Sequence, residues 1–294
     1  MRSIVHSDNG PVQREETHER GVLAGRRLGL VGAGKMAEAI VTGVVRAGVL
    51  PKDRITASDP NPSRREVMAS LGVRTVEENT ALLEASDIVV LAVKPQVIGE
   101  VLDGLAPGVT PEHLIVSIAA GIPTTLIESK LSDGMRVVRV MPNTPMQVGR
   151  GTAALARGSH TTLMDMEAAR TLFATTGIAM EVAEEEMDAV TAVSGTGPAY
   201  AFLLAECMME AGMAEGLSVD LARLITAATI EGAGAFLAST SVAAEDLRKS
   251  VTSPGGTTEA AFNRLEEGKV REHFVAAIRR AADRSRELGS SRGR

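Results

Sequence analysis

The fold of this chain is decided by the stretch Leu28-Gly-Leu-Val-Gly-Ala-Gly-Lys-Met-Ala-Glu-Ala39. The apolar, uncharged run Leu28–Val31 is typical of a buried parallel strand. It breaks into Gly32-Ala33-Gly34, and a helical pattern of apolar residues follows. In a G-x-G-x-x-A fingerprint, the first glycine permits a tight turn, the second lets the backbone approach a pyrophosphate, and Ala37 lets the helix pack closely on the strand. The stretch therefore predicts a dinucleotide site with the anion at the helix N-terminus. The alternative is a glycine-rich turn without a ligand.

A second short strand is predicted over Arg54–Ala57, and it closes the first βαβ unit. Ser58 and Asp59 follow this strand, and Arg64 and Arg65 lie just beyond it. At this position an acidic residue binds the 2′-hydroxyl of NAD, whereas small polar residues and an arginine accommodate the 2′-phosphate of NADP. The segment contains both kinds of residue, so the choice of cofactor stays open. Asp59 has a second interpretation, in which it serves only as the N-cap of the next helix.

Strand and helix patterns continue to alternate after this unit and predict a doubly wound α/β sheet of about eight strands. Lys94-Pro95 stops one strand at the edge where a nicotinamide would lie. Small residues in Ala119-Ala120-Gly121 leave room for a flat ring after another strand, and Met141–Pro145 is expected to form a rigid turn. The expected strands are 28–31, 54–57, 73–76, 87–93, 114–119, 136–140, 151–156 and 179–182, and the helices between them include 35–47, 63–71, 79–84 and 163–176.

The character of the sequence changes after the acidic run Glu184–Glu186, because no strand pattern follows. Helices are predicted over 198–212, 219–237 and 257–288. Two loops punctuated by glycine and proline interrupt them. Ser194–Pro198 and Val251–Thr258 each precede a helix and are expected to offer an N-terminal anion site. The second loop could instead be a simple cap between helices. The predicted organisation is a leader over 1–26, a dinucleotide-binding domain over 27–186, a helical domain over 187–288 and a tail over 289–294.

Composition narrows the class of protein. The 294 residues carry a net charge of −6 and no basic patch, which argues against nucleic acid or an anionic membrane as a partner. The first 26 residues lack the apolar segment of a secretory signal and are expected to be disordered. The single cysteine, Cys207, cannot form an intramolecular disulfide and is predicted to be a small core residue. A cytoplasmic location fits, and no metal site is predicted.

Six motifs, in order and spacing, closely resemble the pyrroline-5-carboxylate reductases over about residues 27–288. The most specific is the last one, Leu247-Arg-Lys-Ser-Val-Thr-Ser-Pro-Gly-Gly-Thr-Thr258. The resemblance implies reduction of Δ1-pyrroline-5-carboxylate to L-proline with NADPH or NADH. It also implies a Rossmann domain followed by an all-α domain that interlocks in a homodimer, often assembled into a higher oligomer. The other motifs are the glycine turn, Leu91–Pro95, Ser117–Gly121, Arg139–Pro145 and Ala192–Phe202.

The resemblance also assigns site residues by position. Thr258 matches the hydroxyl beside the ring nitrogen and is the catalytic candidate, and Glu184 matches a position that can touch cofactor. Ser241 and Ser250 replace a Glu and an Asn found in some family members, which puts those two contacts in doubt. The substrate residues are Ser253, Gly255, Gly256, Thr257 and Thr258, and the cofactor residues are Val31, Gly32, Ala33, Gly34, Lys35, Met36, Ser58, Asp59, Asn79, Ala92, Val93, Lys94, Pro95, Ile118, Ala119 and Ala120.

The expected hydride transfer depends more on correct positioning of the substrate than on a strong catalytic base. A protonated imine accepts hydride readily, and no histidine lies in any of the motifs. The substrate carboxylate is expected at the positive end of the last helix. One alternative is a β-hydroxyacid dehydrogenase, which would need a catalytic lysine in the second domain. Lys249 is the only lysine between 188 and 268. The other alternative is a non-catalytic dinucleotide sensor.

Overall fold

The computed structural model describes residues 21–290 and divides into two compact units, with the boundary between Met187 and Asp188. Residues 1–20 of the predicted leader and 291–294 of the predicted tail lie outside the described residues. Residues 21–25 form a turn, and Leu23 within it is fully buried in the core of the first unit. Ordered structure in the described part therefore starts before the first strand, because this leucine is covered by the sheet domain.

The first unit is built on one eight-stranded sheet with the order β3-β2-β1-β4-β5-β6-β7-β8. All neighbouring strands run parallel except β6 and β7, which are antiparallel. The order 3-2-1-4-5-6 of the first six is that of a doubly wound nucleotide-binding sheet. The predicted fold class is thereby confirmed. The strands are β1 (Leu28–Val31), β2 (Ile55–Ser58), β3 (Arg74–Val76), β4 (Ile88–Leu91), β5 (Leu114–Ser117), β6 (Arg136–Pro142), β7 (Gly151–Arg157) and β8 (Gly177–Glu181).

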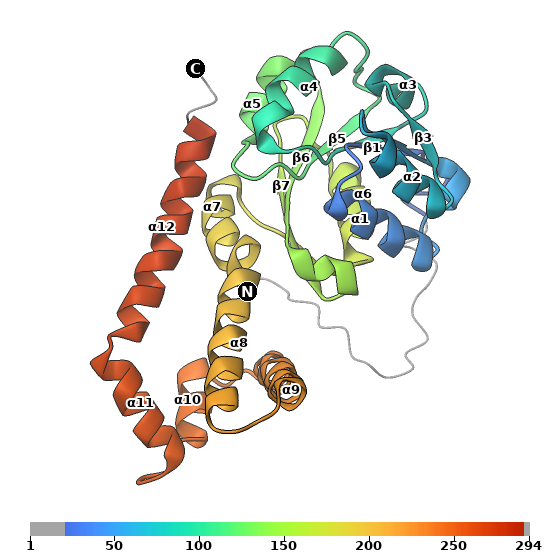
Figure 1. The fold of residues 1–294 in the computed structure, drawn as a ribbon. Helices are drawn as coiled ribbons and strands as arrows, with labels where there is room; N and C mark the ends of the chain where they lie inside the picture. The colour runs from blue at the N-terminus through green and yellow to red at the C-terminus, as the bar shows by residue number, and fades with distance from the viewer. Residues whose placement is uncertain (1–20, 291–294) are drawn as a thin grey trace. The chain divides into compact units, whose positions relative to one another are not determined.

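Helices cover both faces of this sheet, and Figure 1 shows α3, α4 and α5 on one side and α1 and α6 on the other. Alternate residues of each strand enter one core or the other. Val90 packs in the core that contains α1 and α6, whereas Val89 and Leu91 pack in the core that contains α3, α4 and α5. Burial on both faces explains the continuous apolar runs in the sequence. The helices are α1 (Lys35–Arg46), α2 (Pro62–Ser70), α3 (Asn79–Leu83), α4 (Ile98–Leu105), α5 (Thr124–Lys130) and α6 (Leu163–Ala174).

The expected turn at Met141–Pro145 begins later than predicted. Met141 and Pro142 still belong to β6, where Pro142 lies opposite Ala153 of β7. The turn itself is a short 3-10 helix over Thr144–Val148 that ends at Gly149 with a φ of +71°. Asn143 accepts a hydrogen bond from the backbone N–H of Thr152 at 2.8 Å and so fastens the start of β7.

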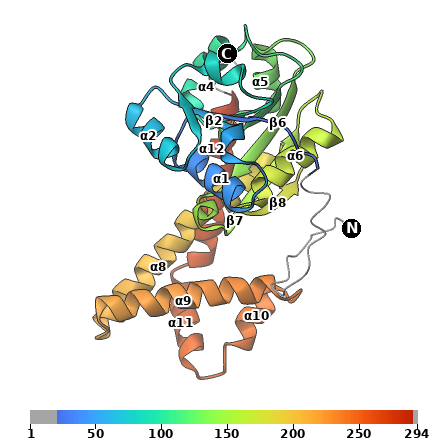
Figure 2. The same cartoon turned by 90° about the vertical axis from the view of Figure 1, so that its right-hand side faces the viewer.

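The second unit is entirely helical, and Figure 2 shows α9 crossing beside α8, with α10 and α11 beyond it. Ser285 of α12 donates a hydrogen bond to Asp188 at 2.6 Å, and Tyr200 of α8 meets Phe274 of α12 edge to face with ring centroids 6.2 Å apart. Few of its side chains are buried. Its helices are α7 (Met187–Val190), α8 (Gly197–Ala214), α9 (Val219–Ala238), α10 (Ala244–Ser250), α11 (Thr257–Glu267) and α12 (Val270–Ser290), and a π-helical turn (Thr191–Gly195) joins α7 to α8.

Three predictions about the helical unit are wrong. The single helix expected over 257–288 is two helices, because Gly268 ends α11 and Lys269 adopts a φ of +51°. Residues 194–198 do not form an open loop before a helix, since the π turn runs directly into α8 and Thr196 N–H donates to the Thr191 carbonyl. No separate anion site arises there. Cys207 is exposed in the single chain rather than part of a core.

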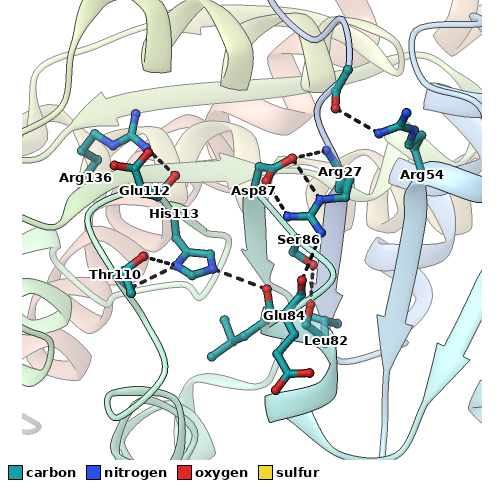
Figure 3. A network of polar contacts seen from close by, with 12 residues as sticks. Arg27, Arg54, Leu82, Glu84, Ser86, Asp87, Thr110, Glu112, His113 and Arg136 are labelled. Carbon is teal, nitrogen blue, oxygen red and sulfur yellow. Dashed lines mark hydrogen bonds and ion pairs between the residues drawn. The ribbon is translucent and has the colours of Figure 1, made fainter.

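The amino-terminal edge of the sheet is held by a polar network (Figure 3). Arg27 and Asp87 directly precede β1 and β4, which pair in register from Leu28 and Ile88. The backbone N–H of Arg27 and its Nη2 each donate to the Asp87 carboxylate at 2.8 Å, and its Nη1 donates to the Glu84 carbonyl. The hydrogen bond from Arg27 is the main reason that the pKa of Asp87 lies below its ordinary value.

Replacing Asp87 by Asn is expected to lower the free energy of unfolding at pH 7 by about 1 kcal/mol. The charge-assisted hydrogen bonds are lost in this variant. The loss of free energy is small because the Arg27 side chain is 40% exposed and solvent screens its charge. A carboxyl whose pKa is lowered by folding stabilises above its unfolded value of about 4 and loses that contribution as the pH falls through its folded value. Urea unfolding followed by circular dichroism at pH 7 and at pH 3 should therefore show the difference shrinking in acid. Asp53→Asn on the exposed 3-10 turn is the control, and equal losses at both pH values would contradict the assignment.

Candidate active site

Four strand ends form a row along the carboxyl edge of the sheet in the first unit. Val31 pairs in register with Ser58 on one side and with Leu91 on the other, and Leu91 pairs with Ser117. The segments predicted to contact cofactor follow these four residues directly. In doubly wound sheets this edge, at the point where the strand order reverses, is where ligands bind. The topology thus brings together residues from four separate parts of the sequence.

The glycine turn after β1 has the features that a pyrophosphate requires. Gly32 adopts a φ of +94°, and a Cβ at this position would lie 2.9 Å from the Ala92 carbonyl oxygen. Gly34 is the N-cap of α1 at a φ of −70°, offers no side-chain acceptor to the first turn, and would have no protein atom within 4 Å of an added Cβ. The fold therefore needs a glycine at position 32 but not at 34. Open space and uncapped N–H groups at Gly34 fit the phosphates of a dinucleotide.

The residues after β2 form a connected set of hydrogen bonds. Ser58 donates to the side chain of Asn79 at 2.7 Å. The Asp59 carboxylate accepts the Ala33 N–H at 2.8 Å and the Asn61 N–H at 2.9 Å. The N-cap of α2 is Asn61, which accepts from the Ser63 N–H. The alternative interpretation of Asp59 as the helix cap is therefore wrong, and its carboxylate instead faces the glycine turn.

The segments after β4 and β5 continue the strand pairing for one residue before they diverge. Ala92 N–H donates to the Val31 carbonyl at 2.8 Å, and Ile118 N–H donates to the Leu91 carbonyl at 3.1 Å. Ala119 is buried, whereas Ala92, Val93, Pro95, Ile118 and Ala120 are half-buried. Lys94 is exposed at the start of a 3-10 turn (Pro95–Val97). This edge is therefore lined by small and apolar groups, with one cation.

A partly buried ion pair lies near this edge, and the sequence predicted a possible cofactor contact for its Glu184 but no role for its arginine. Arg139 of β6 donates to Glu184 at 2.7 Å, and the same oxygen of Glu184 accepts the N–H of Thr124 at the start of α5. Arg139 lies opposite Ser117, the last residue of β5. An arginine within an otherwise apolar strand was the available signal. The pair ties β6 and α5 on either side of the segment 118–123.

The loop 251–256 leads into α11 in the second unit. Gly255 adopts a φ of +68°, and Gly256 approaches Ser253 so closely that a Cβ would lie 2.6 Å from its hydroxyl. Gly256 is the N-cap of α11, without a side-chain cap. Thr257 and Thr258 are the first two residues of the helix. The structure thus presents backbone N–H groups and hydroxyls together at the positive end of this helix, as an anion site needs.

Two side chains near this loop are already engaged. Thr252, which lies in the predicted anion loop, donates to the Arg248 carbonyl at 2.8 Å. Glu259 accepts the Gly255 N–H at 2.8 Å and was missed by the sequence reasoning, although an acidic residue at the third helical position is a known capping signal. Ser250 donates to the Leu247 carbonyl, and Ser241 lies exposed between α9 and α10. Lys249 is paired with Glu245 at 2.8 Å and is exposed.

Comparisons with known proteins agree along the chain. Residues 184–288 match the family model for pyrroline-5-carboxylate reductase dimerisation, and residues 27–121 match a model described as NADP oxidoreductase, coenzyme F420-dependent. The chain is 40% identical to the pyrroline-5-carboxylate reductase of Methanosarcina acetivorans over 268 residues, which covers 91% of this chain and 99% of the relative. It is also 40% identical to that of Pisum sativum over 261 residues, 89% of this chain and 95% of the relative.

Solved structures lead to the same family. A pyrroline-5-carboxylate reductase from Coxiella burnetii superimposes with a TM-score of 0.81 at 35% identity, covering 90% of this chain and 98% of that one. The Plasmodium falciparum pyrroline carboxylate reductase with NADP bound superimposes with a TM-score of 0.84 at 29% identity and the same coverage. The similarity to this family is therefore not confined to the six motifs, because it covers about 90% of the sequence and of the fold. This chain belongs to the pyrroline-5-carboxylate reductase family.

Proposed function

We propose that this chain reduces Δ1-pyrroline-5-carboxylate to L-proline by hydride transfer from NADPH or NADH. The observation that carries the proposal is the presence of two candidate binding sites, one in each unit, in a single chain of this family. One is the row of strand ends with an open glycine turn, and the other is the Ser253–Thr258 loop at the start of α11. A reductase for a cyclic imino acid needs both a dinucleotide cradle and a carboxylate site.

The cofactor is proposed to lie along the carboxyl edge of the sheet. The glycine turn and the N-terminus of α1 would hold the pyrophosphate, and the segments 92–95 and 118–120 would hold the nicotinamide end. NAD(P)H, when bound, supplies the hydride. The Arg139–Glu184 pair keeps the segment 118–123 in position through its bond to Thr124.

The substrate carboxylate is proposed to bind the free N–H groups of Thr257 and Thr258 and the Ser253 hydroxyl. The helix dipole of α11 favours a negative charge there. Thr258 would orient the ring nitrogen with its hydroxyl and hold the proton that makes the imine a better hydride acceptor. The protein's main contribution is to hold C5 about 3–3.5 Å from the hydride donor.

The direct test is loss of absorbance at the reduced-nicotinamide band when pyrroline-5-carboxylate is added to purified protein, with NADPH and NADH in separate assays. Turnover to L-proline is the expected result. Cofactor binding without imine-dependent oxidation would instead favour a dinucleotide sensor. Faster turnover of another cyclic imine would move the substrate assignment to that compound. A β-hydroxyacid dehydrogenase gains no support, because the relatives that the chain matches over most of its length are pyrroline-5-carboxylate reductases.

A homodimer, and above it a higher homo-oligomer, is proposed as the active form. Large apolar side chains of α8 and α9 are exposed in the single chain, including Phe202 at 62% and Leu224 at 67%. Large apolar side chains exposed in this number indicate an interface. The length and composition of Val219–Ala238 would also allow a membrane crossing, but one such helix is weak evidence. Burial in the proposed dimer would account for its apolar character. We also propose a cytoplasmic enzyme without a membrane partner, and the net charge of −6 favours no nucleic-acid partner.

Sedimentation should give at least twice the chain mass of 30.7 kDa at micromolar concentration. Leu224→Glu is expected to shift the protein toward the monomer and to reduce activity, because it places a charge in the apolar interface. Leu163→Glu, at a leucine that is 75% exposed on α6, is the matched control and should leave the mass unchanged. A stable, fully active monomer would contradict the proposal.

A further inference from the structure

The structure points to one residue that decides which reduced dinucleotide is used, a question that the sequence left open. This inference rests on the proposed function, since it concerns the cofactor of the same site. Asp59 directly follows Ser58, which pairs with Val31 at the end of β1. Its side chain therefore stands beside the glycine turn, at the position that meets the adenosine ribose in dinucleotide-binding sheets.

The Asp59 carboxylate is held in place from both sides. One oxygen accepts the N–H of Ala33 within the glycine turn at 2.8 Å. The other accepts the N–H of Asn61 at 2.9 Å, just before α2. Because each bond comes from the backbone of a different element, the carboxylate has little freedom to turn away from a bound cofactor. A 2′-hydroxyl can donate to it, whereas a 2′-phosphate would bring a second negative charge against it.

The two arginines that could receive a 2′-phosphate are engaged elsewhere. Arg64 donates from Nε to the Ala33 carbonyl at 2.6 Å and pairs with Glu38 at 3.2 Å. Arg65 donates to the carbonyls of Asp59 and Pro60 and pairs with Glu77 at 3.2 Å. Each guanidinium thus already has a carbonyl and a carboxylate as partners.

These contacts give the arginines a different role. Both brace the turn that contains Asp59, one through Ala33 and the other through Asp59 itself. Their positive charge is offset by Glu38 and Glu77. A phosphate that took these same donors would cost the arginines the bonds that brace the turn. The Ser58 hydroxyl is likewise bound to Asn79.

We infer that Asp59 makes this chain select NADH over NADPH. The expected result is a kcat/KM for NADH at least tenfold higher than that for NADPH, measured at saturating pyrroline-5-carboxylate. Asp59→Asn keeps an oxygen that can accept a backbone N–H but removes the charge. This variant should change the NADH-to-NADPH ratio at least tenfold toward NADPH, mainly through the KM for NADPH.

Glu66→Gln is the matched control, because this exposed residue of α2 undergoes the same change of charge close by in the sequence. Its ratio should equal that of the unaltered protein. The inference is overturned if the unaltered protein uses NADPH as well as NADH, or if Asp59→Asn leaves the ratio unchanged.

Calorimetric titration with NADH and NADPH, in the absence of any imine, separates this inference from the proposed function. Tighter binding of NADH, reversed toward NADPH in Asp59→Asn, supports the inference even if pyrroline-5-carboxylate is not reduced. Reduction of pyrroline-5-carboxylate with equal binding of both dinucleotides overturns the inference and leaves the proposed function standing. Failure of both dinucleotides to bind overturns both.

Discussion

Replacing Gly34 by serine is expected to raise the KM for the reduced dinucleotide about tenfold or more, which corresponds to a loss of about 1.4 kcal/mol of binding. An added Cβ at this position meets no protein atom within 4 Å, and the φ of −70° suits any residue. The side chain would instead occupy the space through which the backbone approaches a pyrophosphate. Steady-state kinetics with varied cofactor, at saturating imine, measures the effect.

Gly34→Ser should fold normally, so a higher KM in this variant would reflect weaker cofactor binding and not a loss of stability. Serine is at least as good an N-cap as glycine, so its free energy of unfolding should stay within about 0.5 kcal/mol of the original or rise. Gly32→Ser is the contrasting variant. Its φ of +94° and the Ala92 carbonyl 2.9 Å from a Cβ predict a loss of stability of about 1 kcal/mol or more. An unchanged cofactor KM in Gly34→Ser would remove the glycine turn from the cofactor site.

Replacing Thr258 by alanine is expected to lower kcat about tenfold or more, or about 1.4 kcal/mol in the barrier, with little change in the KM for the cofactor. Thr258 is the second residue of α11, where alanine is well tolerated by the helix. The loss would therefore reflect the hydroxyl that orients the ring nitrogen rather than a change of fold. Turnover at saturating cofactor and imine, with the melting temperature measured in parallel, tests this.

Thr258→Ser keeps the hydroxyl and should recover most of the rate. Thr229→Ala on α9, where a hydroxyl donates only to the Ile225 carbonyl of its own helix, is a control that should retain full activity. If Thr258→Ala turns over at the original rate, the hydroxyl has no part in the reaction.

The sheet domain was largely predictable from the sequence because each buried strand is a short apolar run between glycine, proline or charged residues. Leu28–Val31 is the clearest case, since it is the same segment in the prediction and in the structure. The ends of other strands differ by a few residues. The sequence predicts one strand from Asp87 to Val93, whereas β4 covers Ile88–Leu91 and its backbone pairing extends by one residue to Ala92.

The helical unit was harder to predict because its glycine and proline residues do not always break a helix. The glycines and Pro198 in 194–198 suggested a loop, yet a π turn accommodates them and Pro198 sits in the first turn of α8, where its missing N–H costs nothing. Gly268 had the opposite outcome. It lies within an amphipathic pattern that continues past it, so periodicity alone did not indicate the break at Lys269.

The candidate site shows the same limit at the level of single side chains. Two residues before α2, Asp59 and Asn61, are both good N-caps, and their side-chain chemistry alone does not tell which one caps the helix. Pro62 after Asn61 was the decisive signal, because proline favours the first helical position. The bond from Asp59 to Ala33 joins parts of the chain 26 residues apart, and such a contact is visible only once the register of β1 and β2 is known.

The edge-to-face contact between Tyr200 and Phe274 gives the molecule a built-in optical reporter. The chain has one tyrosine and no tryptophan, so its intrinsic ultraviolet emission comes from α8 alone and follows the helical unit. The sheet domain contributes no emission from either amino acid. Fluorescence of reduced nicotinamide can therefore follow occupancy of the glycine turn without a tryptophan background, while tyrosine emission follows unfolding of the helices in the same sample.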